Sequence, residues 1–141
     1  MKAKEYLNRA YRMEQQVESK LQQIASLRSM AQSLTTCLGA EPVSHTRNVA
    51  SMQDTVIKII EEERILTEQI DRLVDVKREI AGTISRVSNV TYRLILEKRH
   101  LSFQMWEQIA CEMNYSIRSI QTKYGEALQV VESLLAEQVV D

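Results

Sequence analysis

Apolar residues recur at alternating steps of three and four along two long stretches, and this spacing is typical of α-helices packed as a coiled coil. The first stretch, residues 2–38, contains neither Gly nor Pro. Its best seam consists of Leu7, Ala10, Glu14, Val17, Leu21, Ile24, Arg28, Ala31, Thr35 and Leu38. The seam of the second stretch consists of Met52, Val56, Ile59, Glu63, Leu66, Ile70, Leu73, Lys77, Ile80, Ile84 and Val87.

The two stretches are separated by a helix-breaking segment. Residues 39–42 read Gly-Ala-Glu-Pro, in which Gly favours a helix C-cap and Pro prevents the helix from resuming. The residues that follow, up to 50, are polar and show no helical pattern. The sequence therefore predicts an antiparallel helical hairpin over residues 1–83 with a loop at about 39–50.

The charged residues of the two seams give a register for this hairpin. If facing residue numbers add to 91, Leu21 meets Ile70, and each charged seam residue finds a partner of opposite sign: Glu14 with Lys77 and Arg28 with Glu63. Such pairs add little net stability but can fix the register of a coiled coil. The alternative is that these side chains lean out to water along their aliphatic stems.

Further apolar residues make the hydrophobic stripe wider than one seam. They are Leu27, Met30, Leu34, Ile57, Ile60, Val74 and Val76. A stripe of this width indicates self-association through the hairpin or docking on a partner. The alternative is that the C-terminal helices fold back and cover it.

Composition narrows the fold class and the function. Three Gly and one Pro among 141 residues leave few turns for a sheet, and no strand-like alternation is present, so the fold class is all-α. Two cysteines without a pairing framework fit a reducing cytoplasm, and no apolar run approaches the ~20 residues of a membrane helix. No catalytic constellation, metal-ligand spacing or phosphate loop is visible, so we expect no enzyme, metal or cofactor.

The C-terminal residues 102–135 read as a short helix, a tight turn and a second helix. Asn114 tolerates the left-handed conformation that ends the first helix, and Ser116 can cap the second by accepting a backbone N–H near Ser119. Small Ala110 lies where the helices approach most closely. The angle between them would be filled by Ile109, Met113, Tyr115 and Ile120.

A supporting helix is expected from Ser85 to Leu101. It would bury Val87, Val90, Tyr92, Leu94 and Ile95, and His100 would flank this core. Together with the helix pair it forms a predicted helix-turn-helix domain over residues 84–141. Gly82 indicates a bend before this domain, and Gly125 indicates either a bend in the last helix or a close approach to another helix.

The outward face of the last helix carries side chains that suit DNA. Arg118, Gln121, Thr122 and Lys123 are its expected contacts, with Ser116 or Ser119 held to phosphate and Arg99 as a further phosphate contact. Residues 84–123 contain six basic and three acidic side chains, which makes this part positive. The alternative is a pair of amphipathic helices that touches no DNA.

The same region resembles a known family. The matching residues are 92–101 (YRLILEKRHL), Trp106, Ile109, Ala110, Met113, Tyr115, Ser116, Arg118, Ile120 and 125–128 (GEAL). They resemble region 4 of sigma-70 factors, and more closely the sigma-region-4-like phage and prophage proteins of Gram-positive hosts, near the phage late-operon transcription regulators. Asn114 replaces the usual turn glycine, and the region that binds the −10 element is missing.

The resemblance implies a transcription regulator that binds double-stranded promoter DNA, RNA polymerase or both. A head with about four phosphate contacts binds weakly at cellular ionic strength, so we expect a homo-oligomer through the N-terminal coiled coil or an attachment to polymerase. A second reading is a coiled-coil interaction protein that binds polymerase or a phage assembly protein without reading DNA. A scaffolding role in virion assembly is a third.

Overall fold

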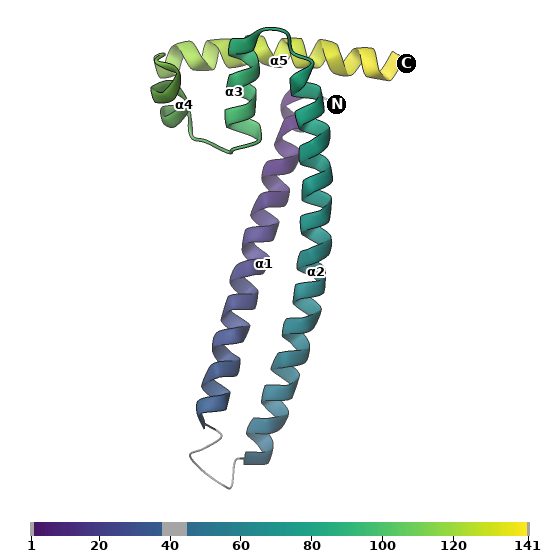
Figure 1. The fold of residues 1–141 in the computed structure, drawn as a ribbon, viewed down its shortest axis with the longest axis vertical. Coiled ribbons are helices and arrows are strands. Elements are labelled where there is room, and N and C mark those ends of the chain that lie inside the picture. The colour runs from purple at the N-terminus through teal and green to yellow at the C-terminus, as the bar shows by residue number, and fades with distance from the viewer. Residues whose placement is uncertain (1, 38–44, 141) are drawn as a thin grey trace. The chain divides into compact units, whose positions relative to one another are not determined.

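The computed structural model describes residues 2–37 and 45–140. In these residues the chain is all-helical and contains no strand, which confirms the predicted fold class. The helices, drawn in Figure 1, are α1 (Ala3–Cys37), α2 (His45–Ser85), α3 (Val90–His100), α4 (Trp106–Met113) and α5 (Ile117–Val140).

The chain divides into two compact units. One contains Met1–Met13 and Leu73–Asp141, and the other contains Glu14–Arg72. The sequence prediction places the boundary between residues 83 and 84 instead. In the structure, the first turns of α1 and the last turns of α2 belong to the same unit as α3, α4 and α5.

In the unit Glu14–Arg72, ion pairs connect α1 with α2. Lys20 Nζ lies 2.6 Å from a Glu62 carboxylate oxygen, and only 18% and 13% of these side chains are exposed. Arg28 pairs with Glu63, as the register predicts, but these side chains are 62% and 42% exposed. An ion pair open to water stabilises little. The shielded contact is therefore Lys20–Glu62, which the sequence prediction did not single out.

Within this unit the packed face of α1 keeps Val17 and Ile24 of the predicted seam but departs from the seam at Leu21. Leu21 and Ile70, which the prediction places opposite each other in the seam, are 49% and 39% exposed. Val17 and Ile24 are buried, and Lys20 lies between them on the same face. The aliphatic stem of a lysine can cover apolar surface while its ammonium group reaches an acid, so a charged residue takes the place expected for leucine.

Helix α2 differs from the prediction at its start. It begins at His45, so residues 45–50 are helical and not part of the loop predicted at 39–50, whereas the predicted break at 39–42 lies outside the described residues. Residues 45–50 contain neither Gly nor Pro, so nothing in their backbone chemistry stops a helix. At its other end α2 runs through Gly82 to Ser85.

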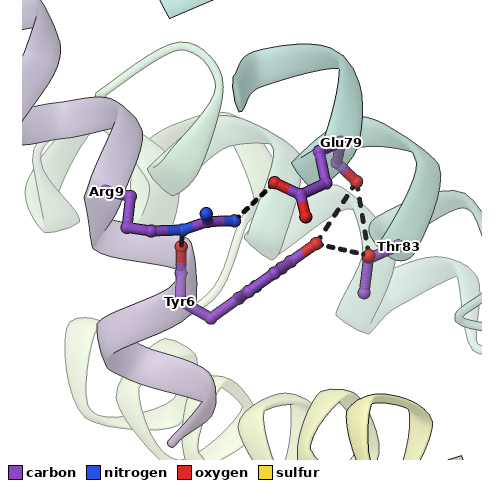
Figure 2. A network of polar contacts seen from close by, with 4 residues as sticks. All are labelled: Tyr6, Arg9, Glu79 and Thr83. Carbon is purple, nitrogen blue, oxygen red and sulfur yellow. Dashed lines mark hydrogen bonds and ion pairs between the residues drawn. The ribbon is translucent and has the colours of Figure 1, made fainter. Parts of the chain in front are cut away.

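In the other unit, the first turns of α1 are joined to the last turns of α2 by a polar network (Figure 2). The hydroxyls of Tyr6 and Thr83 lie 2.9 Å apart in a buried hydrogen bond. Arg9 pairs with Glu79 at 2.7 Å, and its guanidinium lies 4.5 Å from the centre of the Tyr6 ring. These contacts, with the fully buried Leu7, Ala10, Ile80, Ile84 and Val87, hold the first turns of α1 in the unit.

Helix α3 is shorter than the helix predicted over residues 85–101. Chain reversal after α2 leaves residues 87–89 outside any helix, and Asn89 then caps α3. Its side-chain oxygen accepts a hydrogen bond from the backbone N–H of Tyr92 at 3.1 Å. The cap fixes the first residue of α3 as Val90.

The start of α3 also determines which of its residues are buried. Val90 and Leu94, predicted as core, are 55% and 39% exposed, whereas Ile95 and Leu96 are fully buried. Val87 is buried as predicted, but from the loop and not from a helix. A helix that begins five residues later than predicted need not present the same face to the core.

Candidate nucleic-acid interface

Helices α4 and α5 are joined by a turn that Asn114 makes possible. Asn114 has φ 59° and ψ 40°, the predicted left-handed conformation. Its backbone N–H points to the carbonyls of Ala110 and Cys111, and the N–H of Tyr115 donates to the carbonyl of Ala110 at 3.0 Å. Asn is one of the few residues apart from Gly that adopts this conformation readily, so the prediction at this position is confirmed.

Ser116 caps the start of α5. Its Oγ accepts a hydrogen bond from the backbone N–H of Ser119 at 3.1 Å, which confirms the predicted cap. The N–H of Ile120 donates to the Ser116 carbonyl at 3.0 Å and begins the helical ladder. Because the Ser116 Oγ acts only as acceptor in this bond, its O–H group remains able to donate to a phosphate.

One face of α5 is fixed against α3 and α4. Ile120 and Ala127 are fully buried, and Tyr124 is 8% exposed. The ring of Tyr124 meets the Trp106 ring edge-on, with 4.7 Å between the centroids. Ile109 and Ala110 of α4 are also buried, as predicted. This packing fixes the rotation of α5 about its own axis, and hence which side chains point outward.

A buried polar pair lies within this core. His100 Nε2 and the Tyr124 hydroxyl are 2.8 Å apart, and their rings stack with 5.6 Å between the centroids. Burial, with a smaller contribution from the charges of Arg99 and Lys4, lowers the pKa of His100 to about 4. Burial also raises the pKa of Tyr124 to about 12. Both groups are therefore neutral at pH 7, and His100 belongs to the core instead of flanking it.

The outward face of α5 carries three of the predicted contact residues. Arg118, Gln121 and Thr122 are all exposed. Arg118 makes no ion pair with any carboxylate of the described residues. The Thr122 hydroxyl donates to the Arg118 carbonyl at 3.0 Å. Within the described ranges, the Arg118 guanidinium is therefore in no ion pair, and no hydrogen bond of the Gln121 amide is found.

The other two predicted contacts on α5 lie at its side. Ser119 and Lys123 are half-buried, and Lys123 Nζ lies 5.2 Å from the centre of the Tyr115 ring. Tyr115 itself is 40% exposed, so it does not fill the angle between the helices as predicted. The ammonium group of Lys123 lies over its ring instead, a cation–π contact of modest strength.

Arg99 lies apart from these residues. Its guanidinium lies 4.4 Å from the centre of the Trp106 ring, and Nη1 donates to the Gln104 carbonyl at 2.9 Å. These contacts make Arg99 a half-buried support of the α3–α4 connection. It is not brought together with the outward residues of α5 by any contact found here.

Two carboxylates near the interface, Glu112 and Glu126, accept hydrogen bonds from other side chains. Lys98 donates to Glu112 at 2.8 Å, and this hydrogen bond is the main reason that the pKa of Glu112 is lowered. The Tyr92 hydroxyl donates to Glu126, which raises the pKa of that tyrosine. Glu126 is exposed and follows the outward residues of α5 along the helix. It therefore places negative charge in the third turn of α5.

Some structural residues of the site escaped the sequence prediction. Tyr124 continues the apolar spacing of Ile120, Ala127 and Val131, so its position in the core was recognisable from periodicity. His100 and Leu96 had no such signal, because their burial depends on where α3 begins. Among the described residues, no three His, Cys, Asp or Glu side chains gather as they would around a metal ion.

None of the helices in the described ranges combines the length and apolar character needed to cross a membrane. The arrangement presents hydrogen-bond donors on the outward face of one well-fixed helix. Comparisons with family models, with curated proteins and with solved structures found no match to this chain.

Proposed function

We propose that this protein is a phage-type transcription regulator of the bacterial cytoplasm that binds double-stranded promoter DNA. In this proposal α4 and α5 are a helix-turn-helix of the sigma-70 region 4 kind, and α5 is the recognition helix. The observation that carries it is the contrast between the two faces of α5. Ile120 and Tyr124 are buried, whereas Arg118, Gln121 and Thr122 remain exposed, and Arg118 is in no ion pair with the part of the chain that the structure describes.

The chemistry of the outward face supports a major-groove contact. Arg pairs with the O6 and N7 atoms of guanine, and Gln pairs with the N6 and N7 atoms of adenine. Arg118 and Gln121 lie one turn apart on the exposed face, so they can face neighbouring base pairs. Lys123 and the Ser116 hydroxyl then serve as phosphate contacts, and Thr122 joins them when its hydroxyl turns from the Arg118 carbonyl to the phosphate.

One head of this kind needs a second attachment. About four phosphate contacts give a salt slope of only about −3.6, which means weak binding at cellular ionic strength. We propose that α1 and α2 form an antiparallel coiled-coil hairpin that joins copies of the chain, or that RNA polymerase supplies the attachment. Exposed apolar residues in the unit Glu14–Arg72 support association: Leu21, Met30, Val56, Ile57, Ile60 and Ile70.

The experiment uses the full chain and duplex fragments of the source genome in a mobility-shift selection. The wild type should retain a subset of fragments, and Arg118→Ala combined with Lys123→Ala should bind them at least about tenfold more weakly. Lys58→Ala combined with Arg64→Ala, two cations of the other unit, is the matched control and should bind as the wild type does. If the first double variant kept wild-type affinity, α5 would not be the recognition helix.

A second function is favoured by the unit Glu14–Arg72. This segment has six basic and nine acidic side chains, so it repels DNA, and it exposes the apolar residues named above. The protein would then be a coiled-coil adaptor that binds RNA polymerase or a phage assembly protein without reading DNA. Co-purification of polymerase by a chain that retains no genomic fragment would favour this function over the first.

A further inference from the structure

The first turns of α1 carry an exposed basic row that plays no part in the proposed recognition helix. This basic row consists of Lys4, Asn8 and Arg12, which are spaced by four residues and therefore lie on one face of α1. They line a surface groove of about 580 Å³, whose lining residues are Lys2, Lys4, Glu5, Asn8, Arg9 and Arg12. Except for the carboxylate of Glu5, each of these side chains can donate hydrogen bonds.

Of the cations that line this groove, Arg9 is in an ion pair, and none is found for Lys4 or Arg12 among the described residues. Arg9 pairs with Glu79 at 2.7 Å. Lys4 and Arg12 are exposed, and neither makes an ion pair with a carboxylate of the described residues. The charges of these two side chains are therefore open to a partner of opposite charge.

The basic row lies beside the connection between α3 and α4. Tyr11 of α1 meets the ring of Phe103 edge-on, with 5.7 Å between the centroids, and Phe103 lies in the connection at residues 101–105. The charge of Lys4 reaches His100 at the end of α3, where it helps to lower the pKa of that histidine. The row thus belongs to the same compact unit as α4 and α5.

The two units differ in net charge, and each charge suits a different kind of partner. The unit with α3, α4 and α5 has twelve basic and ten acidic side chains, and the first 13 residues supply four of the basic and one of the acidic. The unit Glu14–Arg72 is acidic. An electrostatic footprint for nucleic acid is therefore confined to the unit that contains α5.

We infer that the basic row, together with Lys2 just before α1, is a second phosphate-binding surface for the duplex that α5 reads. In trihelical DNA-binding units the connection between the first two helices contacts backbone phosphates, and here the row borders that connection. The inference rests on the proposed function. It also accounts for tighter binding than a single head would give. The three further cations, Lys2, Lys4 and Arg12, raise the number of phosphate contacts from about four to about seven and steepen the salt slope to about −6.

The test measures the affinity of the full chain for a labelled 30-base-pair duplex, taken from the retained genomic fragments, between about 50 and 200 mM KCl. Lys4→Gln combined with Arg12→Gln should lower the salt slope by about 1.8 and weaken binding by about ten- to a hundredfold near 0.1 M salt. Arg64→Gln, from the acidic unit, is the matched control and should keep the wild-type slope. Circular dichroism should show the same helix content in all three proteins.

The outcomes separate the two proposals. If the wild type does not bind duplex at any salt concentration, the proposed function fails, and the inference fails with it. If the wild type binds in an Arg118-dependent way but the Lys4 and Arg12 double variant keeps the full salt slope, only the inference is overturned. Vesicles containing phosphatidylserine provide a further arm: loss of vesicle binding with an unchanged DNA slope would assign the row to lipid and also overturn the inference.

Discussion

At the residue scale, His100 shows how burial in the core controls a charge. The side chain is 2% exposed, and its Nε2 shares a hydrogen bond with the Tyr124 hydroxyl. Protonation would place a cation in this core next to Arg99 and Lys4, which is why the pKa falls to about 4. The neutral imidazole is the form compatible with the packing that sets the rotation of α5.

This pKa predicts how stability depends on pH. The unfolded chain protonates His100 near pH 6.5 and the folded chain only near pH 4, so the contribution is complete above pH 6.5 and is lost as the pH falls towards 4. Between pH 7.5 and pH 5 the wild type should lose about 2 kcal/mol from this residue. His100→Gln should lose that much less over the same interval in urea unfolding. Parallel pH profiles for the two proteins would contradict the assignment.

Two glycines lie in helices without a packing reason. A Cβ at Gly82 or at Gly125 would meet no atom within 4 Å, so the close helix approach suggested for Gly125 is not present. Each Gly→Ala change should therefore stabilise the protein by about 0.4–1 kcal/mol, because Ala reduces the entropy of the unfolded chain and favours helix. Thermal unfolding of the two single variants and the double variant measures this. A lower Tm for Gly82→Ala would mean that a bend there is needed.

At the element scale, the start of α5 depends on one side-chain hydrogen bond. Ser116→Ala removes the acceptor of the Ser119 N–H and should cost about 1 kcal/mol in the free energy of unfolding. Ser116→Asp, which keeps an acceptor at the helix N-terminus, should restore most of this loss. Urea titrations of the three proteins provide the comparison. Equal stability of the Ala and Asp variants would show that the cap does not hold α5 in place.

The two ion pairs between α1 and α2 should behave differently. Glu62→Gln should destabilise the protein more than Arg28→Gln, because Lys20 and Glu62 are shielded whereas Arg28 and Glu63 are open to water. The hydrogen bond from Lys20 lowers the pKa of Glu62 below 4.5. Its stabilisation is therefore present above pH 4.5 and is lost as the pH falls below that value. Urea unfolding at pH 7 and at pH 3.5 should show a smaller Glu62→Gln difference at the lower pH.

Sequence patterns predicted the local chemistry of these elements better than the faces they present. The left-handed Asn114 and the Ser116 cap depend on neighbouring residues alone, and both were predictable. The half-buried position of Lys20, beside an exposed Leu21, was not predictable. Periodicity classifies residues by polarity and takes no account of the long aliphatic stem of lysine. The late start of α3 was missed, although the Asn89 cap that fixes it is a local signal of the same kind.

At the scale of the whole molecule, the two units differ in charge and in exposed apolar surface. The unit with α5 carries the outward donors of that helix and the basic row of α1, whereas Glu14–Arg72 is acidic and exposes large apolar side chains. Each unit thus has the surface chemistry for a different partner. In the proposed function one binds duplex and the other binds a second copy of the chain, and linking the two raises the effective concentration of heads at a site with two half-sites.

This coupling predicts that a change on the acidic unit will weaken DNA binding. Ile57 and Ile60 are 55% and 62% exposed, so Ile57→Gln combined with Ile60→Gln should not harm the fold but should remove apolar surface available for association. Light scattering should show a multiple of the chain mass for the wild type and a single chain for the variant. Affinity for a two-half-site duplex should fall by about a hundredfold or more, whereas affinity for a single half-site should not change.

The control is Gln22→Ala, an exposed polar change in the same unit, which should leave both mass and affinity as in the wild type. A wild type that already has the mass of one chain would remove self-association from the proposal and leave polymerase as the second attachment.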